Sequence, residues 1–331
     1  MSPVSRPAHA PAAAAPSPAD PAVKTAADAI ALQLAAMIAE HDQAIAGDVE
    51  AIHRLRVATR RLRAGLRMLR EVAPSDETES AADELGWLCG AIGAVRDLDA
   101  LAELLSERAT RLEADFVRAL EPVSISIRRQ RAAEQERLVA ALNSERYRGL
   151  VQRLGTIAPE PSADSVALGA VAARLVRSQI RATLRTGAGL DEASPQQSLH
   201  RLRIRVKKLR YALEPLRAVG GKPVRRMLRR LERVQERVGQ YHDAATAAEW
   251  LRGWAADSHD APPEALMAVG ALIHSLERRI RRLRARSLKA WRHAEIDQMS
   301  RIVLHELNFV AAQARRAAKP PLVLVPVVDP S

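Results

Sequence analysis

The sequence predicts an all-α protein made of two four-helix bundles that arise from an internal repeat. Apolar residues recur at three- and four-residue spacing through almost the whole chain, which is the period of amphipathic helices. Leu, Ala, Arg and Glu dominate, whereas alternating runs rich in Val, Ile and Thr are nearly absent. A motif of eleven residues also occurs twice, so we expect two bundles related by pseudo-twofold symmetry.

Proline, glycine and small polar residues divide the chain into helices. Pro74, Pro122 and the stretch 159–162 are the clearest breaks. Ser194 and Pro195 resemble an N-cap followed by a first-turn proline. The expected helices cover residues 24–45, 48–72, 76–106, 108–120, 123–142 and 145–155 in the first half, and 164–187, 195–218, 222–256, 264–294 and 297–317 in the second.

A length of 331 residues has room for two domains. Residues 1–22 form an Ala/Pro/Ser-rich stretch that we expect to be disordered, and the Pro-rich residues 319–331 form a second tail. The first helical repeat is placed at residues 23–158 and the second at 159–318. Because no secretion signal or long uncharged apolar run is evident, we expect a cytoplasmic protein that does not engage a membrane.

The charge balance points to a negatively charged partner. The chain has 51 Lys and Arg against 39 Asp and Glu, a net charge of +12, and only six of the basic residues are lysine. Four Trp, three Tyr and two Phe are too few for the stacking platforms of sheet-based RNA binders. One cysteine excludes an internal disulfide framework and a Cys-based structural zinc site.

The repeated motif carries most of the information. Residues 53–63 read H-R-L-R-V-A-T-R-R-L-R, and residues 200–210 read H-R-L-R-I-R-V-K-K-L-R. Further on, Gly93 followed by Asp97 recurs as Gly239 followed by Asp243, at nearly the same spacing from the first motif. The chain therefore contains two copies of one helical unit.

On a helix with about 100° per residue, each copy of the motif has a leucine face and an opposite cationic face. The residues of the two cationic faces are His53, Arg56, Arg60, Arg63 and Arg67 in the first copy, and His200, Arg203, Lys207 and Arg210 in the second. A further basic pair lies on the shoulder of each helix, Arg54 with Arg61 and Arg201 with Lys208, and these four residues are also expected to bind an anion.

An ordinary solvated helix face interleaves acids with bases, because like charges three or four residues apart are destabilising. Residues 51–70 and 199–213 contain no acid. We therefore expect a polyanion to lie along these faces. The first face, from His53 to Arg67, is ~21 Å long at 1.5 Å per residue, which suits an extended anion better than one phosphate group.

Motifs for catalysis or metal binding are not evident. The nine histidines form no H-E-x-x-H motif, and no P-loop or nucleophile elbow is present, so we expect no metal, no cofactor and no catalytic residue. His53 and His200 are interpreted as pH-sensitive donors to the anion. Asp97, Asp99 and Asp243 lie beside a glycine at an expected close helix contact. Each of these carboxylates is expected to orient a neighbouring arginine.

The paired motifs, each followed by a G-x-x-x-D segment, resemble the CHAD domain, the conserved histidine α-helical domain, over about residues 25–318. The resemblance implies two helical bundles, inorganic polyphosphate bound in a basic central channel, and an association with polyphosphate granules. It implies binding roles for the cationic faces defined above. The sequence resembles the stand-alone form, since no strand-rich triphosphate tunnel domain is evident. Glu214 departs from the pattern where Arg67 would repeat, and His242 aligns with Arg96.

Two alternatives stay open. The chain could bind nucleic acid through its backbone phosphates, or it could be a polyphosphate-processing enzyme. The oligomeric state, the chain-length preference and the choice among storage, targeting and regulation are not predicted. Two further arginine-rich faces, within residues 174–185 and 278–292, could also line the channel.

Overall fold

The computed structural model describes residues 15–109, 113–159, 161–162 and 165–317. In these residues the regular structure is helical, apart from one isolated bridge between Pro21 and Ala167, so the predicted all-α class is confirmed. The helices are α1 (Ala22–Ala39), α2 (His41–Ile45), α3 (Val49–Val72), α4 (Asp76–Ala109), α5 (Ala114–Ala119), α6 (Glu121–Asn143), α7 (Glu145–Thr156), α8 (Leu168–Gly187), α9 (Gln196–Leu213), α10 (Gly221–Asp257), α11 (Pro263–His293) and α12 (Ile296–Ala317).

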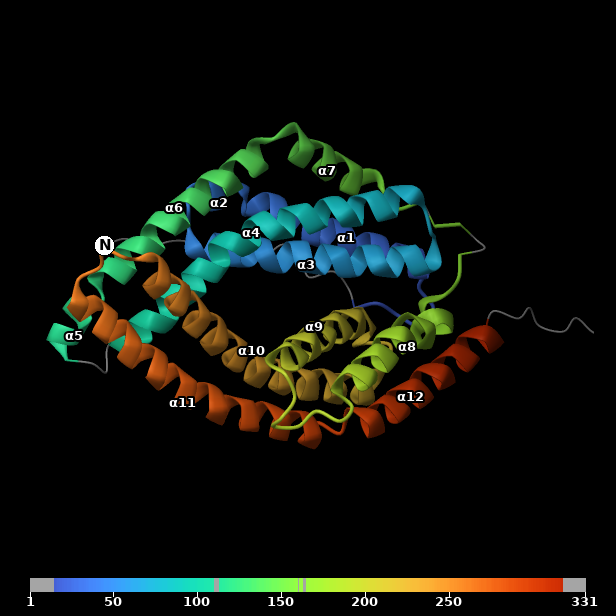
Figure 1. Ribbon diagram of the computed structural model, residues 1–331. Coiled ribbons are helices and arrows are strands. Elements are labelled where there is room, and N and C mark those ends of the chain that lie inside the picture. The colour runs from blue at the N-terminus through green and yellow to red at the C-terminus, as the bar shows by residue number, and fades with distance from the viewer. Residues whose placement is uncertain (1–14, 110–112, 160, 163–164, 318–331) are drawn as a thin grey trace, which may run out of the picture.

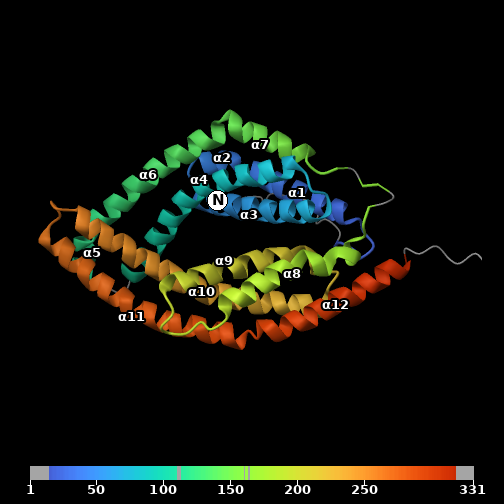
Figure 2. The same cartoon turned by 45° about the vertical axis from the view of Figure 1, so that its right-hand side comes forward.

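Helices of the first half close a ring in which α1 packs on α3, α3 on α4, α4 on α7 and α7 on α1. The second half repeats this order of contacts with α8, α9, α10 and α12. A fifth long helix in each half lies outside the ring, α6 against α4 and α11 against α10. Figures 1 and 2 show the first half above the second, with α6 and α11 along the two outer sides and converging beside α5.

Contacts between the halves mostly join helices in equivalent positions of the repeat. Helix α1 touches α8, α3 touches α9, α4 touches α10, and α6 touches α11. A twofold axis brings each surface element onto its own counterpart in this way. The repeated cationic helices α3 and α9 are therefore neighbours at the junction of the two halves.

Local chemistry explains why α3 begins where it does. The Asp48 carboxylate accepts a hydrogen bond of 2.6 Å from the Ala51 backbone N–H, which is the geometry of a helix N-cap. The predicted leucine face of α3 is buried, with Leu55, Leu62 and Leu69 fully covered. Burial of the equivalent leucines of α9 confirms the same orientation there. Packing of these faces directs the basic residues away from each bundle core.

Several helix boundaries differ from the sequence prediction. The predicted helix 76–106 continues to Ala109 as α4, and the predicted helix 108–120 is only the short α5, Ala114–Ala119. The predicted helix 24–45 is broken at Glu40 into α1 and α2. The predicted helix 195–218 ends at Leu213 and continues only as a 3₁₀ turn, because Pro215 lacks an N–H and hinders the preceding α-turn. Ser194 does not cap α9: its hydroxyl donates to the Asp191 carboxylate within a turn, and α9 starts at Gln196.

The predicted N-terminal tail is partly ordered. Residues 1–14 lie outside the described residues, as does the predicted C-terminal tail 319–331. Just before α1, however, the Pro18 and Asp20 carbonyls accept hydrogen bonds from the Gly169 and Leu168 N–H groups. These bonds fix the start of α1 against the start of α8. The disorder expected for residues 1–22 is therefore wrong for this last part.

One described helix, α1, is long and apolar enough to cross a membrane by length and composition alone. The sequence prediction overlooked this stretch. In the structure α1 packs on α3, and Ile30, Leu34 and Met37 are buried in the core of the first half. A core helix meets the same length and composition criteria as a membrane span.

Candidate functional site

The two repeated cationic faces meet where α3 and α9 adjoin. The Arg60 guanidinium of α3 lies over the Tyr211 ring of α9, with 5.2 Å between Cζ and the ring centroid. Beside it, Arg61 Nε lies 3.9 Å from a carboxylate oxygen of Glu214. We call the meeting surface the cationic seam. Its residues are His53, Arg56, Arg60, Arg63, Arg67, His200, Arg203, Lys207 and Arg210.

Positive charges crowd the middle of the cationic seam. Burial, together with the positive charges of Arg203, Arg60 and Arg56, lowers the pKa of Lys207 to about 6. Burial and the charges of Arg56 and Arg210 likewise lower the pKa of Arg60, against the opposing influence of Tyr211. Two of the cations acting on Lys207 come from α3, in the other half of the chain. The faces of α3 and α9 are thus close enough to repel one another.

A carboxylate from the next helix partners one arginine in each half. Arg56 Nη1 donates to Asp97 Oδ1 on α4 at 2.9 Å. In the second half, Arg203 Nη2 lies 3.9 Å from Asp243 Oδ1 on α10, so this ion pair is looser. The G-x-x-x-D motif therefore supplies these two acids, and the hydrogen bond expected for Asp97 is present.

The glycines of the same motif do not have the expected role. A Cβ placed on Gly93 or Gly239 would meet no heavy atom within 4 Å. The prediction of a close helix contact at these glycines is therefore wrong. Each glycine borders open space on its helix, α4 or α10, four residues before the aspartate that pairs with a seam arginine.

The two halves differ at the end of the seam that contains Arg67. In the second half, Arg210 Nη1 lies 3.7 Å from Glu214 and 3.8 Å from Glu232. Among the described residues, Arg63 and Arg67 of the first half have no carboxylate within 4 Å. A small cavity of about 50 Å³ lies beside Arg67, between α3, α8 and α9. Glu214, the departure noticed in the sequence, thus lies near Arg210 of the second half and Arg61 of the first, but not near Arg63 or Arg67.

Histidines lie at the other end of the seam. The rings of His200 and His242 are 4.8 Å apart, and their Nδ1 atoms are separated by 3.4 Å. Burial and the charges of Arg203, His200 and Lys207 lower the pKa of His242 to about 4. At the equivalent position of the first half, Arg96 lies 3.6 Å from Glu103. His53 is exposed.

The four shoulder residues take different positions. The Arg54 guanidinium donates two hydrogen bonds, of 2.7 and 2.9 Å, to the Glu40 carboxylate. These bonds connect α3 to the end of α1. Arg201 donates to the Ser198 hydroxyl on its own helix. Burial and the charges of Arg205, Arg67 and Arg63 lower the pKa of Lys208, which places Lys208 near the seam. Arg61 is partnered by Glu214, so the shoulder residues do not form one continuous surface.

Sequence reasoning missed two participants. Tyr211 is 6% exposed and is approached by the guanidinium groups of both Arg60 and Arg210, at 5.2 and 4.9 Å. It directly follows the second motif, so its position was visible but its role was not. His242 was noticed only as an alignment partner of Arg96, because nothing local shows that it reaches His200. Within the described residues, no cluster of three or more His, Cys, Asp and Glu side chains could hold a metal ion.

The fold and the cationic seam define a class of all-helical protein with an internal repeat and a basic surface at the junction of its halves. Residues 28–252 match the CHAD domain, so this chain belongs to the CHAD domain family.

Two solved structures are similar to this chain. The crystal structure of the CHAD domain from the plant Ricinus communis aligns with a TM-score of 0.65 and 25% identity, covering 90% of this chain and 97% of that one. PptA from Streptomyces chartreusis aligns with a TM-score of 0.64 and 20% identity, covering 82% of this chain and all of that one, which shows a likeness of fold.

Curated relatives are the uncharacterized proteins MT2285 and Rv2226 from two strains of Mycobacterium tuberculosis. Each is 27% identical to this chain over an alignment of 219 positions that covers 63% of this chain. This chain spans 42% of the length of those relatives.

Proposed function

We propose that this protein binds inorganic polyphosphate along the cationic seam. The observation that carries the proposal is the crowding of Arg56, Arg60, Arg203 and Lys207. Burial, together with the positive charges of these three arginines, lowers the pKa of Lys207 to about 6. Like charges brought together in the absence of an anion destabilise the free protein. A string of phosphates between α3 and α9 would relieve that repulsion.

The chemistry of the seam suits phosphate. Arginine presents several N–H donors in a planar fork that matches phosphate oxygens, and it stays charged at any physiological pH. Arg203 and Arg210 are 18% exposed, and the Nε of each is buried without a hydrogen-bond partner among the described residues. A phosphate oxygen could satisfy such a donor. The cationic face of α3, from His53 to Arg67, is ~21 Å long, which is enough for several phosphate units.

The contacts between equivalent helices support a pseudo-twofold arrangement with the seam along its axis, as a basic central channel. In this proposal the repeats at 23–158 and 159–318 each form one wall of the channel. The chain would act in the cytoplasm without catalysis, as a granule-associated module or one that targets polyphosphate.

Nucleic acid is the alternative partner, bound through its backbone. One feature disfavours it: the aromatic residue at the seam, Tyr211, is buried and covered by Arg60 and Arg210, so it offers no free face on which a base could stack. The other alternative, a polyphosphate-processing enzyme, predicts release of orthophosphate in the presence of magnesium. Loss of that release in His53→Ala would support an enzyme.

The decisive experiment titrates labelled long-chain polyphosphate against the full chain and a variant with Arg56, Arg60, Arg203 and Lys207 changed to alanine. We expect at least a hundredfold loss of affinity and a smaller salt dependence, by about 0.7 in the log–log slope for each lost phosphate contact. The matched control changes Arg225, Arg226, Arg229 and Arg233 on α10 to alanine, which removes four exposed charges that do not belong to the seam.

Unchanged affinity in a seam variant with a normal helical circular dichroism spectrum would refute this placement. An equal loss of affinity in the α10 control would show that net charge, and not the seam, determines binding. Competition by RNA of equal total charge, as strong as competition by unlabelled polyphosphate, would favour the nucleic-acid alternative.

A further inference from the structure

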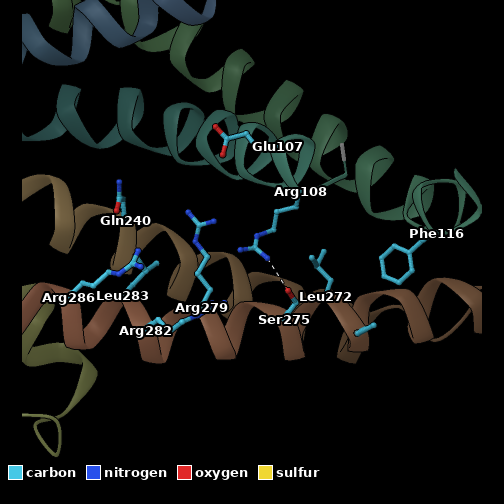
Figure 3. A pocket seen from close by; sticks show the side chains of 11 residues that line it. Glu107, Arg108, Phe116, Gln240, Leu272, Ser275, Arg279, Arg282, Leu283 and Arg286 are labelled. Atoms are coloured by element: carbon cyan, nitrogen blue, oxygen red, sulfur yellow. Dashed lines mark hydrogen bonds between the residues drawn. The ribbon is translucent and has the colours of Figure 1, made fainter. Parts of the chain in front are cut away.

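A second cationic cavity lies away from the seam. Its volume is about 630 Å³, within the usual range of small-molecule sites, and it is bordered by the end of α4, α5, α10 and α11. None of its lining residues belongs to the cationic seam. Figure 3 shows Arg108 reaching from α4 towards α11, where it donates to the Ser275 hydroxyl at 3.0 Å.

Three arginines on one side of α11 supply the positive charge of this cavity. Arg279, Arg282 and Arg286 are spaced by three and four residues, and all of them line the cavity. No carboxylate of the described residues lies within 4 Å of these three guanidinium groups. These three guanidinium groups carry fifteen N–H donors along ~10 Å of helix.

The other end of the cavity is apolar. Phe116 of α5 and Leu272 of α11 line it, and Leu272 is buried. In Figure 3 these two side chains lie on one side of Arg108, whereas Arg279 and Arg286 lie on the other. The cavity therefore combines a cluster of arginines with an apolar end that includes an aromatic ring. The carboxylate of Glu107 on α4 also lines it.

We propose that this cavity is a second anion site, which binds a group of two or three adjoining phosphates against Arg279, Arg282 and Arg286. Adjoining phosphates match the spacing of the three arginines, because successive guanidinium groups on one helix side are only a few ångströms apart along the axis. Two sources carry this chemistry: a short inorganic polyphosphate, and the phosphate tail of a nucleoside triphosphate whose base lies against Phe116.

Calorimetric titration of the full chain with tripolyphosphate tests the site. The seam variant with Arg56, Arg60, Arg203 and Lys207 changed to alanine serves as the background, so that binding at the cavity is measured alone. We expect it to retain about one equivalent of tripolyphosphate. Adding Arg279→Ala, Arg282→Ala and Arg286→Ala should weaken that binding at least tenfold.

The matched control changes Arg278, Arg281 and Lys289 to alanine in the same background. These residues lie on α11, carry the same total charge and do not line the cavity. Retained binding in this control supports the site. Equal weakening in both triple variants, or none in either, overturns it. Because the seam is already disabled, the result does not depend on whether long-chain polyphosphate binds there.

The same titration with ATP, without magnesium, separates the two sources. Tighter binding of ATP than of tripolyphosphate, with the difference removed by Phe116→Ala, identifies a nucleotide. Equal binding of both ligands, unaffected by Phe116→Ala, identifies an inorganic oligophosphate. If neither ATP nor tripolyphosphate binds the seam variant at near-physiological salt, the proposal is overturned.

Discussion

The Arg60 guanidinium lies over the Tyr211 ring, 5.2 Å from its centroid, and this contact joins the repeated helices α3 and α9 across the two halves of the chain. Arg60 and Tyr211 are 151 positions apart in the sequence. Arg210 approaches the same ring to 4.9 Å, so one aromatic side chain contacts a cation from each half. The ring's negative face thereby offsets part of the repulsion between them.

Tyr211→Leu is predicted to destabilise the protein by about 1–2 kcal/mol, because it removes a desolvated cation–π contact while keeping an apolar side chain. Tyr211→Phe keeps the ring face and should change the free energy of unfolding by less than about 0.5 kcal/mol, because the ring is the source of the attraction. Urea unfolding followed by circular dichroism measures both. Equal destabilisation by the two variants would assign the effect to the hydroxyl group instead.

The two halves are predicted to contribute unequally to polyphosphate affinity. Arg67 has no carboxylate within ion-pair distance among the described residues, whereas Arg210 lies near both Glu214 and Glu232. Arg67→Gln should weaken binding five- to tenfold, and Arg210→Gln less than threefold. Fluorescence titration of labelled polyphosphate would measure the difference. A larger loss with Arg210→Gln would contradict this asymmetry.

Polyphosphate binding is predicted to take up a proton at Lys207. Its pKa is about 6 in the free protein, so the amine is mostly neutral at pH 7.5, and a bound polyanion raises that pKa by attraction. Affinity should therefore increase as pH falls from about 8 to about 6, by up to about tenfold per pH unit. The groups acting on Lys207 are Arg203 on its own helix, Arg56 and Arg60 on α3, and Asp243 on α10.

Calorimetry in two buffers of different ionisation enthalpy counts the protons taken up. Lys207→Arg is the control, because arginine stays charged throughout this range. It should flatten the pH dependence that belongs to Lys207. The same pH dependence in Lys207→Arg would assign the proton to the histidines.

Lys207→Met is predicted to stabilise the free protein. The unfolded chain holds this proton up to about pH 10.5 and the folded chain only up to about 6, so wild-type stability rises with pH across that window. Methionine is uncharged, so it removes both the cost of burying the charge and the repulsion from the neighbouring arginines. The gain in the free energy of unfolding should be largest below pH 6 and at least about 1 kcal/mol at pH 7. It should vanish above pH 10.5. Denaturant unfolding at pH 6, 7.5 and 9 checks this trend.

Gly187→Ala is predicted to destabilise the second half by roughly 1–3 kcal/mol, because a Cβ there would overlap the Trp291 ring of α11. The Trp291 indole N–H also donates to the Gly187 carbonyl at 2.9 Å, so the ring is held in place. Gly253→Ala is the control: it lies inside α10 with no heavy atom within 4 Å of the added methyl. There alanine should stabilise by about 0.5–1 kcal/mol. Thermal unfolding of both variants measures the contrast.

Much of the cationic seam was predictable because its determinants are local. The helical period alone sorts Leu55, Leu62 and Leu69 onto one side of α3 and Arg56, Arg60 and Arg63 onto the other. Burial of the leucines then directs the arginines outwards. The same reasoning failed at Ser194, where a turn centred on Asp191 competes for the hydroxyl that would otherwise cap α9.

The amino-acid sequence by itself determined the helices, the internal repeat and the basic face of each copy, because these follow from periodicity within a few turns of chain. Tertiary structure alone decided that the two basic faces meet and that Tyr211 lies between them. It also decided that Asp97 partners Arg56 more closely than Asp243 partners Arg203. Such contacts join residues on different helices, so they depend on how whole bundles pack, and no local pattern encodes that packing.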